Sequence, residues 1–79
     1  MQSKELGSLI CFHRKRAGLT QIELAEHSGV SRSVVQELEA GAGRTTWSNM
    51  EAVLEVLNLR LEPEGPLVKA WRNSIEEAS

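Results

Sequence analysis

The stretch from residue 20 to residue 39, TQIELAEHSGVSRSVVQELE, constrains the fold more than any other part of the chain. Thr20 is a strong helix N-cap residue, and Glu23, three residues later, completes a capping box. Gly29 can end this helix, because glycine takes the left-handed backbone conformation without steric penalty. Ser31 can then cap a second helix. The stretch therefore predicts two short helices joined by a turn of about four residues.

The apolar side chains of these two helices indicate how they pack. In the second helix, Val35 and Leu38 lie three residues apart and therefore on one side. Ala25 in the first helix is small, which allows the second helix to cross close to it. This arrangement is the geometry of a helix-turn-helix. A helical hairpin with a different role is the alternative that these residues leave open.

The order of residues across the two helices resembles a known family. The pattern TQ-x-x-LA-x-x-x-GVSRS-x-V-x-x-x-E-x-G is similar to the Cro/C1-type (XRE) helix-turn-helix domain of phage repressors and many bacterial regulators. The resemblance runs roughly from Leu6 to Leu59 and is specific only in residues 20–41. It implies an all-α bundle of four to five helices that binds double-stranded DNA.

The length and the scarce cysteine and histidine limit what else the chain can be. Seventy-nine residues make one small domain, whose core is marginal without help from a partner chain. The single cysteine, Cys11, excludes an intrachain disulfide and a cysteine-based zinc site. His13 and His27 are too few and too scattered for a metal site, and no catalytic motif is present. We therefore expect a protein that is not an enzyme and has no cofactor, metal or small-molecule ligand.

The charge of the chain is unevenly distributed. The formal net charge is −2, but residues 1–50 carry six Lys and Arg against five Glu, whereas residues 51–79 carry three against six. A DNA-binding face would therefore be a local patch in the first half. The sequence has no run of ~18 apolar residues and no signal-peptide pattern. We expect a cytoplasmic bacterial protein without membrane contact.

The outward face of the second motif helix is the candidate DNA-reading surface, because its N-terminal residues meet base edges in the major groove. Arginine can pair with guanine, glutamine with adenine, and serine with either. The N-terminus of the first motif helix can contact a phosphate of the DNA backbone. The resemblance implies that the segment after the second motif helix contacts the DNA backbone as well. The predicted base-reading residues are Ser31, Arg32, Ser33 and Gln36, and the predicted phosphate contacts are Gln21, Arg44 and Thr45.

A first helix is predicted from Ser3, as its N-cap, to about Ala17. The resemblance implies that Arg14 of this helix pairs with Glu39, which would tie the first helix to the end of the third.

The first helix also carries a second apolar stripe, formed by Leu9 and Phe12, at positions that are usually polar in relatives. We predict that Trp71 and Ile75 from the C-terminal segment cover it. Otherwise the stripe is a contact surface for another protein.

The residues after the motif predict one more helix and one strand. A capping box of Ser48 and Glu51 is expected to start the fourth helix. Residues 58–63, NLRLEP, then alternate polar and apolar side chains, and the proline ends this strand pattern.

The predicted strand lacks a partner in its own chain, so we expect antiparallel pairing with the same segment of a second copy. The homodimer interface would consist of Leu59, Arg60, Leu61 and Glu62. Such a dimer predicts a near-palindromic operator.

These elements divide the chain into a helix-turn-helix domain with its strand, residues 1–66, and a short amphipathic helix and tail, residues 67–79. A fourth helix running into this strand is similar to HipB-like antitoxins. That resemblance implies a homodimeric repressor that binds its own operon's operator and a HipA-family kinase toxin. The Trp71 helix departs from the pattern. A phage-type or stand-alone repressor without a toxin, and a protein-interaction module on the same fold, remain alternatives.

Overall fold

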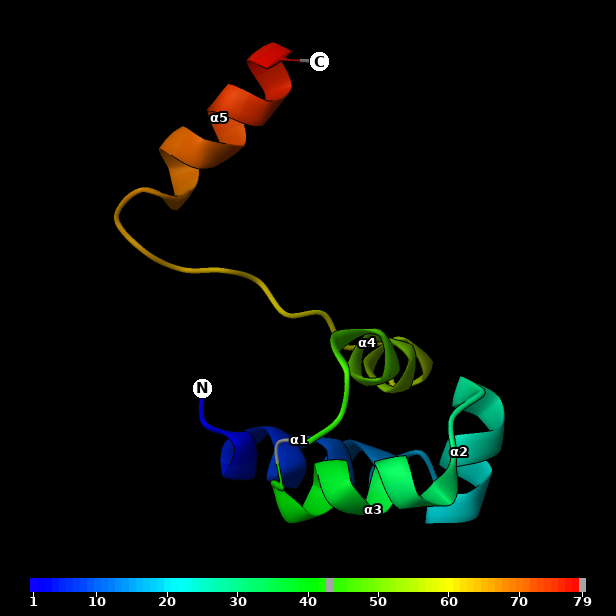
Figure 1. Cartoon of the computed structure of the whole chain (residues 1–79). Helices are drawn as coiled ribbons and strands as arrows, with labels where there is room; N and C mark the ends of the chain where they lie inside the picture. The colour runs from blue at the N-terminus through cyan, green and yellow to red at the C-terminus, as the bar shows by residue number, and fades with distance from the viewer. Residues whose placement is uncertain (43, 79) are drawn as a thin grey trace.

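The computed structural model describes residues 1–42 and 44–78, and over that part of the chain the protein is all-helical. Figure 1 shows the first four helices gathered into a bundle and the fifth standing apart from it. The predicted all-α bundle with a helix-turn-helix is confirmed. Gly43 and Ser79, the last residue of the predicted tail, lie outside the described residues. The five helices are α1 (Ser3–Arg16), α2 (Gln21–Ser28), α3 (Arg32–Ala40), α4 (Trp47–Val56) and α5 (Val68–Ala78).

The core of the bundle receives one completely buried side chain from each of its four helices. α1 packs on α3, and α2 packs on both α3 and α4. Complete burial of an aliphatic side chain contributes about 1.5–3 kcal/mol, so these side chains carry much of the stability of the bundle. They are Ile10 of α1, Leu24 of α2, Val35 of α3 and Val53 of α4, each 0% exposed.

Gly7 sets how closely α1 and α3 approach each other. A Cβ atom at this position would lie 2.5 Å from the carbonyl oxygen of Leu38 and 2.7 Å from that of Glu39. Real Cβ atoms do not come so near to a backbone oxygen, so only glycine allows this crossing. The close approach places the middle of α1 beside the end of α3.

The helix-turn-helix forms as the sequence predicts. The Thr20 hydroxyl accepts a hydrogen bond from the backbone N–H of Glu23, and the Glu23 carboxylate accepts one from the N–H of Thr20. Gly29 takes the left-handed conformation with φ 71°, and the next N–H, that of Val30, donates to the carbonyl of Ala25. Ser31 caps α3. The turn is therefore fixed by hydrogen bonds at both ends.

Two predicted helix caps are wrong. Ser3 is the first residue of α1, and its N-cap is Gln2, which makes no side-chain capping bond. Ser48 lies inside α4, whose N-cap is Thr46 with φ −77° and ψ 158°. The Thr46 hydroxyl accepts a hydrogen bond from the N–H of Asn49 at 3.2 Å. The helix starts earlier because this hydroxyl already satisfies one of its free N–H groups.

The strand prediction for residues 58–63 is wrong at its first residue. Asn58 has φ 57°, and its N–H donates to the carbonyl of Glu55. The N–H of Leu59 donates to the carbonyl of Leu54 at 2.9 Å. These two bonds form a Schellman motif, so Asn58 ends α4 instead of starting a strand. The rest of the segment forms no regular structure among the described residues.

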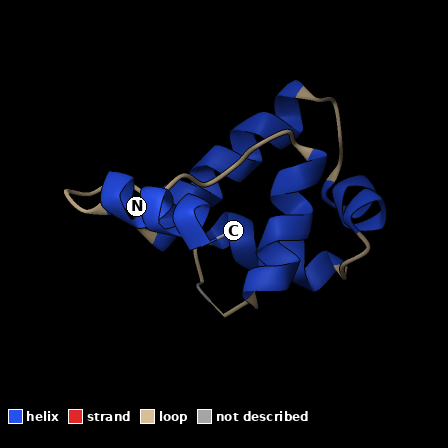
Figure 2. Ribbon diagram, turned by 90° about the horizontal axis from the view of Figure 1, so that it is seen from above, coloured by secondary structure: helices blue, strands red, loops and turns tan. Residues whose placement is uncertain are grey.

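α5 lies away from the bundle in Figure 1, whereas in Figure 2, which looks down on the molecule from above, it overlaps the bundle in projection. No residue of this helix is buried. The radius of gyration is 14.7 Å, whereas a compact chain of this length has about 12 Å. The chain therefore consists of a packed bundle and a helix that the bundle does not cover.

Candidate nucleic-acid interface

The outward face of α3 carries the predicted base-reading side chains. Val35 is fully buried and Leu38 is 5% exposed, so these two residues hold the opposite face of α3 against the core. Arg32, Ser33 and Gln36 are all exposed. A helix packed on the core thus presents one guanidinium, one hydroxyl and one carboxamide to solvent, the groups that read base edges in the major groove.

Ser31 contributes to the structure as well as to the candidate surface. Its hydroxyl oxygen accepts a hydrogen bond from the N–H of Val34 at 3.3 Å, which caps α3. The side chain is exposed at the start of the helix. A serine hydroxyl has one donor as well as its acceptor lone pairs. The O–H of Ser31 therefore stays free to donate while the oxygen caps the helix.

The three predicted phosphate contacts lie in different surroundings. Gln21 is the first residue of α2, and its side-chain amide donates to Glu39 at 3.3 Å. Arg44 is exposed. Thr45 is half-buried, and its hydroxyl oxygen is buried without a hydrogen-bond partner among the described residues. In this conformation a contact from Thr45 to a phosphate would come from its backbone.

An ion pair between Arg14 and Glu39 lies beneath this surface. The guanidinium Nε donates to Glu39 Oε2 at 2.6 Å, and Nη2 donates to Oε1 at 2.9 Å. The two side chains are 11% and 8% exposed. Arg14 Nη1 also donates to the carbonyl of Leu19 at 2.8 Å. Together with Gln21, this pair connects α1, the start of α2 and the end of α3.

The charges of this pair are fixed by their contacts. Burial raises the pKa of the Glu39 carboxyl, but the hydrogen bonds from Arg14 and Gln21 outweigh it, so the pKa lies below its ordinary value. The pKa of Arg14 is raised, chiefly by its hydrogen bond to Glu39. Glu39 is therefore an anion whose charge Arg14 neutralises, which limits its repulsion of a nearby phosphate.

The apolar stripe on α1 is not covered by α5. Phe12 is 54% exposed, and Trp71 and Ile75 are 52% and 49% exposed. The Phe12 ring instead lies 5.0 Å from the guanidinium carbon of Arg16, a cation–π contact. The expected packing of the C-terminal segment on Phe12 and its neighbour Leu9 is therefore wrong in the single chain. The apolar stripe on α1 does not determine where α5 packs, because a long connection separates α5 from the bundle.

The residues predicted to form the dimer lie along the connection between α4 and α5. Leu59 is half-buried, and Leu61 is 37% exposed. Glu62 forms ion pairs within its own chain, with Arg60 at 3.9 Å and with Arg72 of α5 at 2.8 Å. The Arg72 contact is one that sequence reasoning missed, and its ten-residue separation gives no local signal.

Comparison with known proteins agrees with this geometry. A family model described as Helix-turn-helix matches residues 13–63, more than half of the chain. The protein therefore belongs to the Helix-turn-helix family, a DNA-binding family whose members are typically not enzymes. No curated protein matches the chain.

Two further properties concern the described residues alone. None of their helices combines the length and the apolar character that crossing a bilayer requires. No group of three or more His, Cys, Asp or Glu within them is placed to hold a metal ion.

Proposed function

We propose that this protein is a sequence-specific double-stranded-DNA-binding transcriptional repressor that acts as a homodimer. The observation that supports this most is the outward face of α3, where Arg32, Ser33 and Gln36 are exposed on a helix fixed by a buried opposite face. A reading helix must be rigid because each base contact depends on the position of its side chain.

In this proposal the contacts fall into two kinds. Arg32 pairs with a guanine and Gln36 with an adenine, while Ser31 and Ser33 complete the base contacts. The N-terminal amides of α2 at Gln21 hold a backbone phosphate, because a helix N-terminus carries free N–H groups and a partial positive charge. Arg44 and the backbone of Thr45 hold the backbone on the other side of α3. Contacts of the second kind position the protein without reading sequence.

The homodimer would form through residues 59–63, which have no strand partner among the described residues of their own chain. Antiparallel pairing with a second copy would satisfy their backbone groups and bring Leu59 and Leu61 of both copies together. Arg60 and Glu62 would lie on the opposite face of the ribbon. The two copies of α3 would then lie about 34 Å apart, one turn of DNA, on a near-palindromic operator.

Gel-shift titrations with a set of related operators test the two kinds of contact. Arg32→Ala and Gln36→Ala should each weaken binding to the preferred sequence by about 1–3 kcal/mol and relax the preference at one base. Arg44→Ala should weaken binding evenly across sequences and reduce its salt dependence. Lys69→Ala, which removes a cation from α5, is the matched control. It should leave the affinity, the base preference and the salt dependence unchanged. If all four variants behave alike, α3 is not the reading helix.

A more specific form of this proposal is that the protein is the antitoxin of a HipA-type kinase toxin operon, whose promoter it represses. Its support is the resemblance of residues 6–59 and the apolar stripe of Phe12, which is exposed, and Leu9, which is half-buried; this stripe would hold the toxin. Co-purification with the product of the adjacent gene tests it, and Phe12→Ser should abolish that co-purification. A stand-alone repressor would bind DNA without such a partner, and a pure interaction module would bind no DNA.

A further inference from the structure

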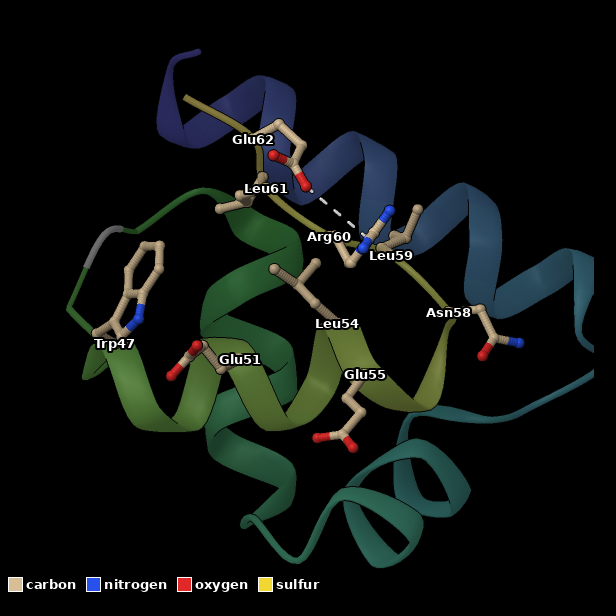
Figure 3. Close-up of a pocket in the computed structure, with 9 residues that line it drawn as sticks. All are labelled: Trp47, Glu51, Leu54, Glu55, Asn58, Leu59, Arg60, Leu61 and Glu62. Carbon is tan, nitrogen blue, oxygen red and sulfur yellow. Dashed lines mark ion pairs between the residues drawn. The ribbon is translucent and has the colours of Figure 1, made fainter. Parts of the chain in front are cut away.

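An open groove of 650 Å³ lies between α4 and the connection that follows it. Figure 3 shows Leu54 and Leu59 within this groove, with Trp47 on the α4 side and Leu61 on the side of the connection. Trp47 is 59% exposed and Leu61 is 37% exposed. The α4 groove, as we call it, therefore offers a large aromatic ring and a leucine that the described chain covers only in part.

The same chain carries an apolar helix face without a partner. Leu67, directly before α5, and Trp71 and Ile75 within it follow one another at four-residue spacing and therefore share one side. They are 77%, 52% and 49% exposed. α5 has 11 residues and α4 has 10, so at 1.5 Å per residue they are about 16.5 and 15 Å long. α5 thus matches α4 in length, and its apolar face has four apolar counterparts among the nine residues that line the groove: Trp47, Leu54, Leu59 and Leu61.

The turn before α5 directs this helix away from its own groove. Arg72 of α5 donates to Glu62 of the connection at 2.8 Å, and the N–H of Val68 donates to the carbonyl of Gly65 at 3.2 Å. Pro63 and Trp71 line an open apolar hollow of about 600 Å³ at the same turn. In Figure 1 the connection leaves α4 and α5 continues farther from the bundle. The groove and the helix face of one copy are therefore kept apart.

We propose that α5 of each copy docks into the α4 groove of a second copy, so that the homodimer exchanges its C-terminal helices. This inference rests on the antiparallel ribbon proposed above for residues 59–63. Pairing centred on Leu61 sets Pro63 of one chain opposite Leu59 of the other, at the mouth of the second groove. α5 begins five residues after Pro63, a reach of up to about 17 Å. Trp71 and Ile75 then enter the groove, while Arg72 keeps its pair with Glu62 of its own chain.

The size of a stable interface favours this exchange. A specific protein interface of standard size uses about 20–30 residues a side, whereas the ribbon alone supplies only residues 59–63. Docking of α5 adds its 11 residues from each copy and the groove residues that receive them. It also covers Trp47 and Trp71 of each copy, which are 59% and 52% exposed in the single chain. The second copy is thus the occupant that both unpartnered surfaces fit.

Cross-linking between two single-cysteine variants tests the exchange directly. In a Cys11→Ser background, Glu51→Cys marks the groove and Ser74→Cys marks the edge of the apolar face of α5. One variant carries a tag, so that the mixed dimer separates from both self-linked products after treatment with a short bis-maleimide reagent. The expected result is a mixed dimer. Lys69→Cys, on the opposite side of α5, is the control and should give much less of it.

Two results would overturn the proposal. If a chain carrying both cysteines links only to itself, and the mixture gives no mixed dimer, α5 docks within its own chain. If neither the mixture nor the doubly substituted chain links positions 51 and 74, α5 does not occupy the groove at all.

Sedimentation separates this inference from the ribbon on which it rests. Trp71→Ser should raise the dimer dissociation constant about tenfold or more while the thermal melt of the bundle stays unchanged. Leu61→Pro should abolish dimers by removing a ladder donor. If Trp71→Ser leaves the dissociation constant unchanged while Leu61→Pro gives monomers, the ribbon stands and the exchange is wrong. If Leu61→Pro remains dimeric, the proposed ribbon itself is wrong.

Discussion

The bundle of α1–α4 and the segment from Leu59 to Ala78 place the same kinds of side chain in opposite surroundings. Ile10 is fully buried and Ile75 is 49% exposed. One Arg–Glu pair is about nine-tenths buried in the bundle, whereas the pair of Arg72 and Glu62 is half exposed. The same types of side chain therefore stabilise the fold of the bundle, whereas in the C-terminal segment they are exposed and can contact another molecule.

This difference assigns separate tasks to the two regions. A DNA-reading helix needs a fixed position, and α3 has one because its inner face is buried. An assembly surface needs apolar groups that a single chain leaves uncovered, and α5 has no buried residue. Matched substitutions in the two regions can test whether burial, and not residue type, makes this distinction.

The largest contrast is expected between the two Arg–Glu pairs. Glu39→Gln should destabilise the protein by about 3–5 kcal/mol, because Arg14 would remain buried without a counter-charge. Glu62→Gln should cost no more than about 1 kcal/mol, since water and salt already screen its exposed pair. Urea unfolding of both variants at neutral pH measures the difference. A melting temperature of Glu39→Gln within a degree or two of wild type would contradict the role of burial.

The pH dependence of stability independently tests the contribution of the pair of Arg14 and Glu39. The pKa of Glu39 is lowered in the folded protein, so its contribution is complete above the ordinary glutamate pKa of about 4.3. The contribution is lost as the pH falls through the lower pKa of the folded state. Wild type should therefore lose stability on acidification, and the loss should be smaller in Glu39→Gln.

The next contrast compares one isoleucine from each region. Ile10→Ala should cost about 2–5 kcal/mol, because it removes buried methyl groups and leaves a cavity between α1 and its neighbours. Ile75→Ala should change the unfolding free energy of the monomer by less than about 0.5 kcal/mol. Unfolding is followed by circular dichroism at dilutions where sedimentation shows monomers. Equal costs at the two positions would mean that α5 is packed on the bundle in solution.

The sequence predicted the helix-turn-helix well because its signals are local. The capping box at Thr20, the left-handed Gly29 and the cap at Ser31 all act within a few residues of their own position. The three-residue spacing of Val35 and Leu38 likewise defines the inner face of α3, and so its outer face. Exposure of the predicted reading side chains follows from this local pattern.

Features that depend on contacts between distant residues were harder to predict. Gly7 is required by the backbone of α3, about thirty residues away, and nothing near it in the sequence indicates that crossing. Glu62 pairs with Arg72 on α5 as well as with the nearby Arg60, and nothing local in the sequence indicates the contact with Arg72. Asn58 was misread for a different reason. An asparagine after a helix can end it in the left-handed conformation. The alternation of polar and apolar residues after Asn58 favoured a strand instead, so this helix-ending role was not predicted.

The smallest contrast is expected at the start of α4, where the sequence offers several candidate caps in close succession. Thr46 has the extended backbone of an N-cap and accepts the N–H of Asn49, whereas Ser48 lies within the first turn. Thr46→Ala should therefore cost about 1 kcal/mol. Ser48→Ala should cost nothing or stabilise slightly, because alanine has the higher helix propensity. Thr46→Ser keeps the hydroxyl and is the control.

Fraying of this turn would also displace Trp47, so Thr46→Ala should weaken dimers if the α4 groove receives α5. Equal costs for Thr46→Ala and Ser48→Ala would place the start of α4 at Ser48, and the groove would then lose the tryptophan that forms one of its sides.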